Sequence, residues 1–174
     1  EYIVHHLTHL NSLGHKQASL VDWSVFHLDT LFWSITLGLL TVLILARAAA
    51  KATSGVPGRF QAAVEILIEM VESQSKSIVH GDRSFIAPLA LTVFVWIFFM
   101  NAMDLLPVDL IPSIWHQAGP ALGVKDYMRV VPTADINATL GMSVGVFVLC
   151  IYYSIKIKGL GGWIHELFTA PFGN

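Results

Sequence analysis

The sequence predicts an all-α membrane protein with three transmembrane helices and an amphipathic helix on the cytoplasmic surface. Of its 174 residues, 55% are hydrophobic and 13% are charged, about half the charged share of roughly 25% in soluble domains. Three apolar segments each reach the length of about 20 residues that a hydrocarbon core of ~30 Å requires. A more polar stretch between the first two has apolar residues at the helical period.

The three spans are expected at residues 28–50, 85–106 and 133–156. Trp23 and Trp33 at the start of the first span are typical of an interfacial aromatic belt. Pro88 falls in the first turn of the second span and Pro107 follows its end, both positions that a helix tolerates. Thr133 is expected to cap the third span. The remaining segments are expected outside the hydrocarbon: a tail at 1–27, a segment at 51–84, an irregular loop at 107–132 and a tail at 157–174.

The amphipathic helix is expected at about 57–79. Its apolar residues recur on one side: Phe60, Val64, Leu67, Val71 and Ile78. Charged residues cover the other side: Glu65, Glu69, Glu72 and Lys76. The pattern fits a helix lying on the membrane surface, and it fits equally a helix that binds a partner protein.

Basic residues predict the orientation, because cytoplasmic loops carry an excess of Lys and Arg. Seven of the ten fall on one side of the expected spans: Arg47, Lys51, Arg59, Lys76, Arg83, Lys156 and Lys158. That side is predicted to be cytoplasmic. The N-terminal tail and the loop at 107–132 are then periplasmic.

Polar side chains gather where the second and third spans reach this periplasmic side. They are Asn101, Asp104, Asp109, Asp135 and Asn137. Carboxylates at such a depth are costly unless water or protein solvates them, and they often mark proton paths. The group is therefore predicted to hold water and exchange protons.

Simpler roles exist for the same residues. Asp135, like Asp29 in the first span, complements the dipole of a helix start. Asp109 is equally compatible with a residue exposed to bulk water. Asn101 and Asp104 are compatible with hydrogen bonding between helices or with solvation at the membrane interface. Arg129 either pairs with one of these acids as an entrance ion pair or is a solvated loop residue.

Several other chemistries have no support in the sequence. No phosphate-cradling GxxxxGK[ST] motif and no dense basic run is present, so neither nucleotide nor nucleic-acid binding is predicted. His5, His6 and His9 share a helical face, which raises the hypothesis of a small membrane metalloenzyme. No carboxylate or thiol accompanies them at ligand spacing, so no metal site, cofactor or catalytic site is predicted. Cys150 lies inside a span and is interpreted as packing.

Four long strings carry a family resemblance: ATSGVPGRFQ, IAPLALTVFVWIFFMNAMDLLPVDLIP, RVVPTADINATL and YSIKIKGLGG. Together they resemble subunit a of the bacterial F-type ATP synthase, the membrane stator beside the rotating c-ring. The resemblance implies a non-catalytic, ion-translocating subunit of the bacterial inner membrane. Its partners would be the c-ring, the peripheral-stalk b subunits, the lipid bilayer and the translocated proton.

The resemblance also implies a proton path of two offset half-channels. The five polar residues of the second and third spans match the periplasmic half-channel of the family, and Arg129 matches a position close to its entrance. The family's essential arginine lies on two tilted helices that would follow Asn174, so the chain is expected to be the N-terminal part of the subunit. The alternative is a structural scaffold without ion conduction, which docks peripheral partners through the surface helix and the Gly141/Gly145 face.

Overall fold

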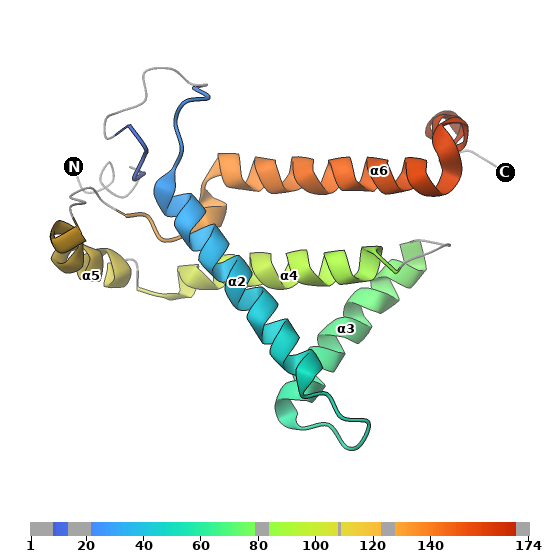
Figure 1. Cartoon of the computed structure of the whole chain (residues 1–174), viewed down its shortest axis with the longest axis horizontal. Helices are drawn as coiled ribbons and strands as arrows, with labels where there is room; N and C mark the ends of the chain where they lie inside the picture. The colour runs from blue at the N-terminus through green and yellow to red at the C-terminus, as the bar shows by residue number, and fades with distance from the viewer. Residues whose placement is uncertain (1–8, 14–21, 79–83, 108, 123–127, 170–174) are drawn as a thin grey trace. The chain divides into compact units, whose positions relative to one another are not determined.

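The computed structural model describes residues 9–13, 22–78, 84–107, 109–122 and 128–169, and these residues are mainly helical (Figure 1). The α-helices are α2 (Leu28–Ala50), α3 (Arg59–Ile78), α4 (Ile86–Ala102), α5 (Leu110–Ala118) and α6 (Ile136–Thr169). Short 3₁₀ turns are η1 (Met103–Leu105), η2 (Gly119–Leu122) and η3 (Pro132–Ala134). Among the described residues, three helices are long and apolar enough to cross a membrane: Leu28–Ala50, Ile86–Leu105 and Ile136–Thr169. The predicted fold class is confirmed.

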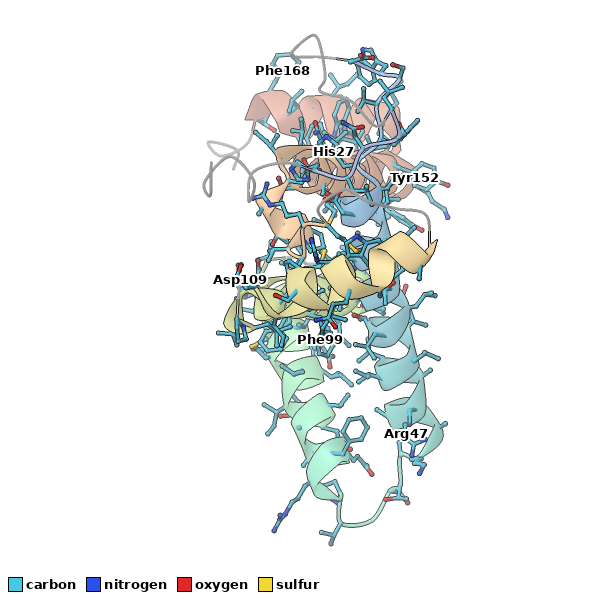
Figure 2. All side chains as sticks on the ribbon, turned by 90° about the vertical axis from the view of Figure 1, so that its left-hand side faces the viewer. His27, Arg47, Phe99, Asp109, Tyr152 and Phe168 are labelled. Atoms are coloured by element: carbon cyan, nitrogen blue, oxygen red, sulfur yellow. The ribbon has the colours of Figure 1, made fainter. Side chains whose placement is uncertain are left out.

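The chain forms two compact units that divide between Thr133 and Ala134. The first contains α2 to α5, and the second contains α6. In the first unit, α2 leads to the turn before α3, α3 returns to the start of α4, and α4 crosses α2 (Figure 1). His27 and Arg47 lie at opposite ends of α2 (Figure 2).

The contact between α2 and α4 depends on one glycine. The Trp96 indole Nε1 of α4 donates a hydrogen bond to the Ser34 carbonyl oxygen of α2 at 2.9 Å. A Cβ atom at Gly38 would lie 3.2 Å from the same Nε1. Small residues permit this close approach of helices in membranes, and the backbone carbonyl satisfies an indole N–H that lipid cannot.

Helix α3 occupies the stretch predicted to be amphipathic and packs against both α2 and α4. Val71, from the predicted apolar side, is buried, whereas Phe60 at the start of that side is 49% exposed. Gln61 fixes the turn before α3, because its Nε2 donates to the Thr53 carbonyl oxygen at 2.9 Å and to Glu65 at 2.7 Å. The cytoplasmic placement of α3 stays a prediction.

The segment expected as an irregular loop at 107–132 contains a helix, which is a difference from the prediction. Helix α5 includes Pro112 as its third residue, and Pro112 is buried. Proline is tolerated there because the first backbone N–H groups of a helix have no intrahelical acceptor.

The third apolar helix also extends beyond its predicted end at residue 156. Helix α6 continues to Thr169 across a kink at Gly159, where φ is +73° and ψ is 163°. Its axis turns sharply near the C-terminal end in Figure 1. Glycine adopts this positive φ without the Cβ clash of other residues. The Lys158 ammonium then pairs with the Glu166 carboxylate beyond the corner.

Candidate functional site

A buried carboxylate at the start of α2 connects three segments of the first unit. Asp29 has 0% exposure. Its Oδ2 accepts hydrogen bonds from the backbone N–H groups of Leu10 and Arg129, both at 3.1 Å, and its Oδ1 accepts one from Thr30 at 2.8 Å. Backbone donors of this kind compensate a buried carboxylate for its lost water.

The His9 imidazole extends this cluster to the Arg129 side chain. Its Nδ1 lies 3.5 Å from Asp29 Oδ2, and its Nε2 lies 3.1 Å from Arg129 Nη1. A guanidinium only donates hydrogen bonds, so His9 Nε2 must be the acceptor and the proton of a neutral ring is on Nδ1, facing Asp29. The His27 ring stacks on His9, with centroids 4.3 Å apart and planes 1° from parallel.

A short antiparallel ribbon positions both histidines. Asn11 and His27 form an isolated β-bridge. The Leu28 N–H donates to the Leu10 carbonyl oxygen at 2.7 Å, and the Ser12 N–H donates to the Phe26 carbonyl oxygen at 2.9 Å. The N-terminal segment therefore lies against the residues that lead into α2 (Figure 2, where His27 is labelled).

The predicted polar residues of the second span follow the C-terminal end of α4. Asn101 lies in its last turn, Asp104 lies in η1, and Asp109 (labelled in Figure 2) directly precedes α5. All three side chains are exposed. Asn101 Oδ1 accepts a hydrogen bond from the Thr133 hydroxyl at 2.8 Å, a contact between α4 and η3 across 32 residues of sequence.

In the second unit, Asp135 caps α6. Its Oδ1 accepts a hydrogen bond from the Asn137 N–H at 3.0 Å, and its carbonyl oxygen accepts one from the Thr139 N–H at 3.2 Å. The cap was predicted at Thr133. The 3₁₀ turn η3 continues to Ala134 and delays the start of α6 to Ile136, so the capping position moves to Asp135. Asn137 is exposed in the first turn.

The sequence analysis did not predict the hydrogen-bond partners of Asp29 or the contact between His9 and Arg129. Asp29 was interpreted as a first-turn acid that complements the helix dipole, and His9 was considered only for a metal site. A signal was present, since Asp29 is the single acid in the first apolar span and an acid in a span requires a partner. His5 and His6 of the metal hypothesis lie outside the described residues.

Comparison with known proteins identifies the family. Residues 31–173 match the family described as "ATP synthase A chain". The chain belongs to this family. It is 61% identical over 178 residues to "ATP synthase subunit a" of Paracidovorax citrulli (strain AAC00-1) and 61% identical over 176 residues to that of Acidovorax sp. (strain JS42). Identity to "ATP synthase subunit a" of Verminephrobacter eiseniae (strain EF01-2) is 55% over 175 residues.

Each of these alignments covers 99% of the chain and 60% of the relative. The chain therefore spans about 60% of the length of these curated relatives. Membership of the ATP synthase A chain family confirms the resemblance carried by the four sequence strings. It also agrees with the three membrane-capable helices of the structure.

Proposed function

We propose that the chain is the N-terminal part of subunit a, the non-catalytic stator of the membrane sector of a proton-transporting ATP synthase, and that it carries the periplasmic half-channel entrance. The observation that carries this proposal is the 2.8 Å hydrogen bond between the Thr133 hydroxyl and Asn101 Oδ1. Asp135 follows Thr133 by two residues, so the chain keeps it within about 7 Å of Thr133. Within the first unit, the hydrogen bond connects the residue that precedes the third span to the end of the second span.

The chemistry of the proposed entrance is proton exchange between water and carboxylates. Asp104 and Asp109 are exposed and lie where α4 gives way to a 3₁₀ turn and a short connection. Backbone of this kind is stable near a membrane only where water or protein covers it. Asn101 and Asn137 supply amide groups that hold water without adding charge.

The driving force for this path is the proton motive force, about 2.3 kcal/mol per charge for each 100 mV. The chain would deliver protons toward the c-ring without a direct leak. The b subunits and lipid would be its further partners in the bacterial inner membrane.

The proposed topology follows the distribution of basic residues. Residues 1–27 and 107–132 face the periplasm, and residues 51–84 and 157–174 face the cytoplasm. Arg47 in the last turn of α2 and Lys76 in the last turn of α3 would lie on the cytoplasmic side. Cysteine labelling from each side of oriented membranes tests this arrangement at Ser12 and Ser77.

The test of the entrance uses the complete subunit in its assembled complex. Asp104→Ala and Asp135→Ala are each expected to slow proton-driven ATP synthesis, and the combined Asp104, Asp109 and Asp135 variant is expected to slow it most. Asp22→Ala is the matched control, because the Asp22 carboxylate binds Ser24 within the N-terminal ribbon at 2.6 Å. Assembly is measured as subunit content of the membrane. Parent rates in the combined variant would refute the entrance role.

A structural scaffold is the second candidate function. It is supported by the apolar side chains that α3 leaves exposed, Ile66 at 64% and Ile78 at 74%. On this account, changes at Leu67 or Gly145 abolish assembly, whereas the acids tolerate replacement. The same set of variants therefore separates the two candidates.

A further inference from the structure

We propose that His9 is a positioning residue that holds the Arg129 guanidinium while its imidazole is neutral and releases it when the imidazole is protonated. The inference rests on the proposed function, because it assigns a pH-dependent control of the same entrance. His9 and its stacking partner His27 belong to the ribbon before α2, and neither was among the residues predicted to form the half-channel.

The geometry assigns opposite roles to the two nitrogens of His9. Nε2 lies 3.1 Å from Arg129 Nη1 and accepts its hydrogen bond. Nδ1 lies 3.5 Å from Asp29 Oδ2, a longer contact that orients the ring without being an ordinary hydrogen bond. The parallel His27 ring covers one face of His9. The neutral ring with its proton on Nδ1 fits all three neighbours.

Protonation of His9 would break the contact between its Nε2 and the Arg129 guanidinium. A second proton on Nε2 places two donors and two positive charges at the 3.1 Å contact. The Asp29 carboxylate faces the opposite nitrogen and already accepts three backbone hydrogen bonds. Asp22, an acid of the segment between the two paired stretches of the ribbon, is bonded to Ser24.

The groups that face His9 in the first unit therefore favour different protonation states. Asp29, from α2, favours the imidazolium. Arg129, from the segment before η3, opposes it, and the His27 ring stacked on His9 supplies no negative charge.

Only the side chain of Arg129 would be released. Its backbone N–H stays bonded to Asp29 Oδ2 at 3.1 Å, so the segment remains docked. A free guanidinium in the segment before η3 repels incoming protons and attracts carboxylates within its reach. The device would slow proton uptake as the outer solution becomes acidic.

The first experiment measures the His9 ring directly and does not depend on transport. The complete subunit, assembled and reconstituted in lipid, is labelled with ¹⁵N-histidine, and its spectrum is compared with that of His9→Gln to assign the His9 signals. At pH 8 we expect Nδ1 to carry the proton and Nε2 to be bare, and we expect Arg129→Gln to abolish this preference. A protonated Nε2 at pH 8, or a His9 spectrum that Arg129→Gln leaves unchanged, would overturn the proposal.

The second experiment measures ATP synthesis against external pH from 5.5 to 8 at a constant total proton motive force. Loss of one charge-assisted hydrogen bond changes an equilibrium about tenfold or more. The rate of ATP synthesis in the parent is therefore expected to fall clearly as the external pH is lowered toward 5.5. His9→Gln keeps an acceptor that does not titrate and is expected to flatten this decline. His9→Leu, which has no acceptor, is expected to show the low acid-side rate at every pH.

His116→Gln is the matched control, because His116 is an exposed histidine in the last turn of α5. It should follow the parent pH profile. If the His9→Gln profile overlays that of the parent, the proposal is wrong even when the entrance variants behave as predicted. If instead the Asp104, Asp109 and Asp135 variants keep parent rates while the ¹⁵N result holds, the proposed function fails and the His9–Arg129 contact stands.

Discussion

Trp96 donates its indole N–H to the Ser34 carbonyl oxygen at 2.9 Å, directly beside Gly38. The hydrogen bond fixes the position along α2 at which α4 crosses it. Gly38 fixes the distance, because a Cβ atom there would lie 3.2 Å from the indole nitrogen. The crossing in turn positions the end of α4, where the proposed entrance begins.

Gly38→Leu is expected to weaken the α2–α4 contact. Added methylenes in a packed contact cost roughly 1–3 kcal/mol, so the melting temperature of the detergent-purified subunit should fall. Gly58→Leu is the matched control, since nothing lies within 4 Å of a Cβ atom at that position. Equal stability of the two variants would show that the crossing tolerates a wider separation.

Trp96→Phe is expected to have a smaller effect at the same crossing. Phenylalanine keeps an aromatic ring beside Gly38 but cannot donate to the Ser34 carbonyl, and one neutral hydrogen bond contributes about 0.5–1.5 kcal/mol. Thermal unfolding of the purified subunit measures this loss. A destabilisation as large as that of Trp96→Ala would mean that the hydrogen bond, and not the ring, holds the helices together.

Apolar length and composition were sufficient to predict the three membrane-capable helices and the amphipathic α3. These features are local, because a helix in lipid satisfies its own backbone and its sequence alone determines whether the side chains suit lipid. The position of Gly38 opposite Trp96 is different. It depends on the crossing of two helices, whose hydrogen-bonded residues Ser34 and Trp96 lie 62 positions apart in the sequence.

The partners of Asp29 could not be predicted from local pattern for the same reason. The N–H groups that bind its carboxylate come from positions 19 and 100 residues away. The capping residue of α6 was predicted at Thr133 and lies at Asp135, since a 3₁₀ turn and a helix start have nearly the same sequence signals. How Asp104, Asp109 and Asp135 cooperate stays a prediction.

Asp29→Ala is expected to destabilise the first unit more than any single change at the exposed acids. It leaves the N–H groups of Leu10 and Arg129 without their acceptor, at roughly 1–3 kcal/mol for each buried donor left unpaired. Amide hydrogen exchange should then accelerate at Leu10 and Arg129. Asp22→Ala, an acid of the same ribbon, should leave both amides protected, and unchanged exchange in Asp29→Ala would contradict the contacts described above.

Gly159→Ala is expected to straighten or strain the corner of α6. The observed φ of +73° costs a residue with a Cβ atom roughly 1–2 kcal/mol. Spin labels at Tyr152 and His165 should report a longer distance than in the parent. Gly161→Ala serves as control, because that glycine has no positive φ and no atom within 4 Å of its Cβ position. The same distance in both variants would show that Lys158 and Glu166 hold the corner without the glycine.

Thr133→Val is expected to slow proton-driven synthesis although no acid has been changed. Valine keeps the shape of threonine but cannot donate to Asn101 Oδ1, so the turn before α6 loses its contact with α4. We expect proton uptake at the proposed entrance to depend on this contact at the end of α4. Thr133→Ser restores the hydroxyl and should recover the rate, whereas Thr139→Val, whose hydroxyl binds carbonyl oxygens within α6, should stay near the parent value. A Thr133→Val rate equal to the parent would mean that proton uptake does not depend on the Asn101–Thr133 contact, and the proposed entrance would lose its main support.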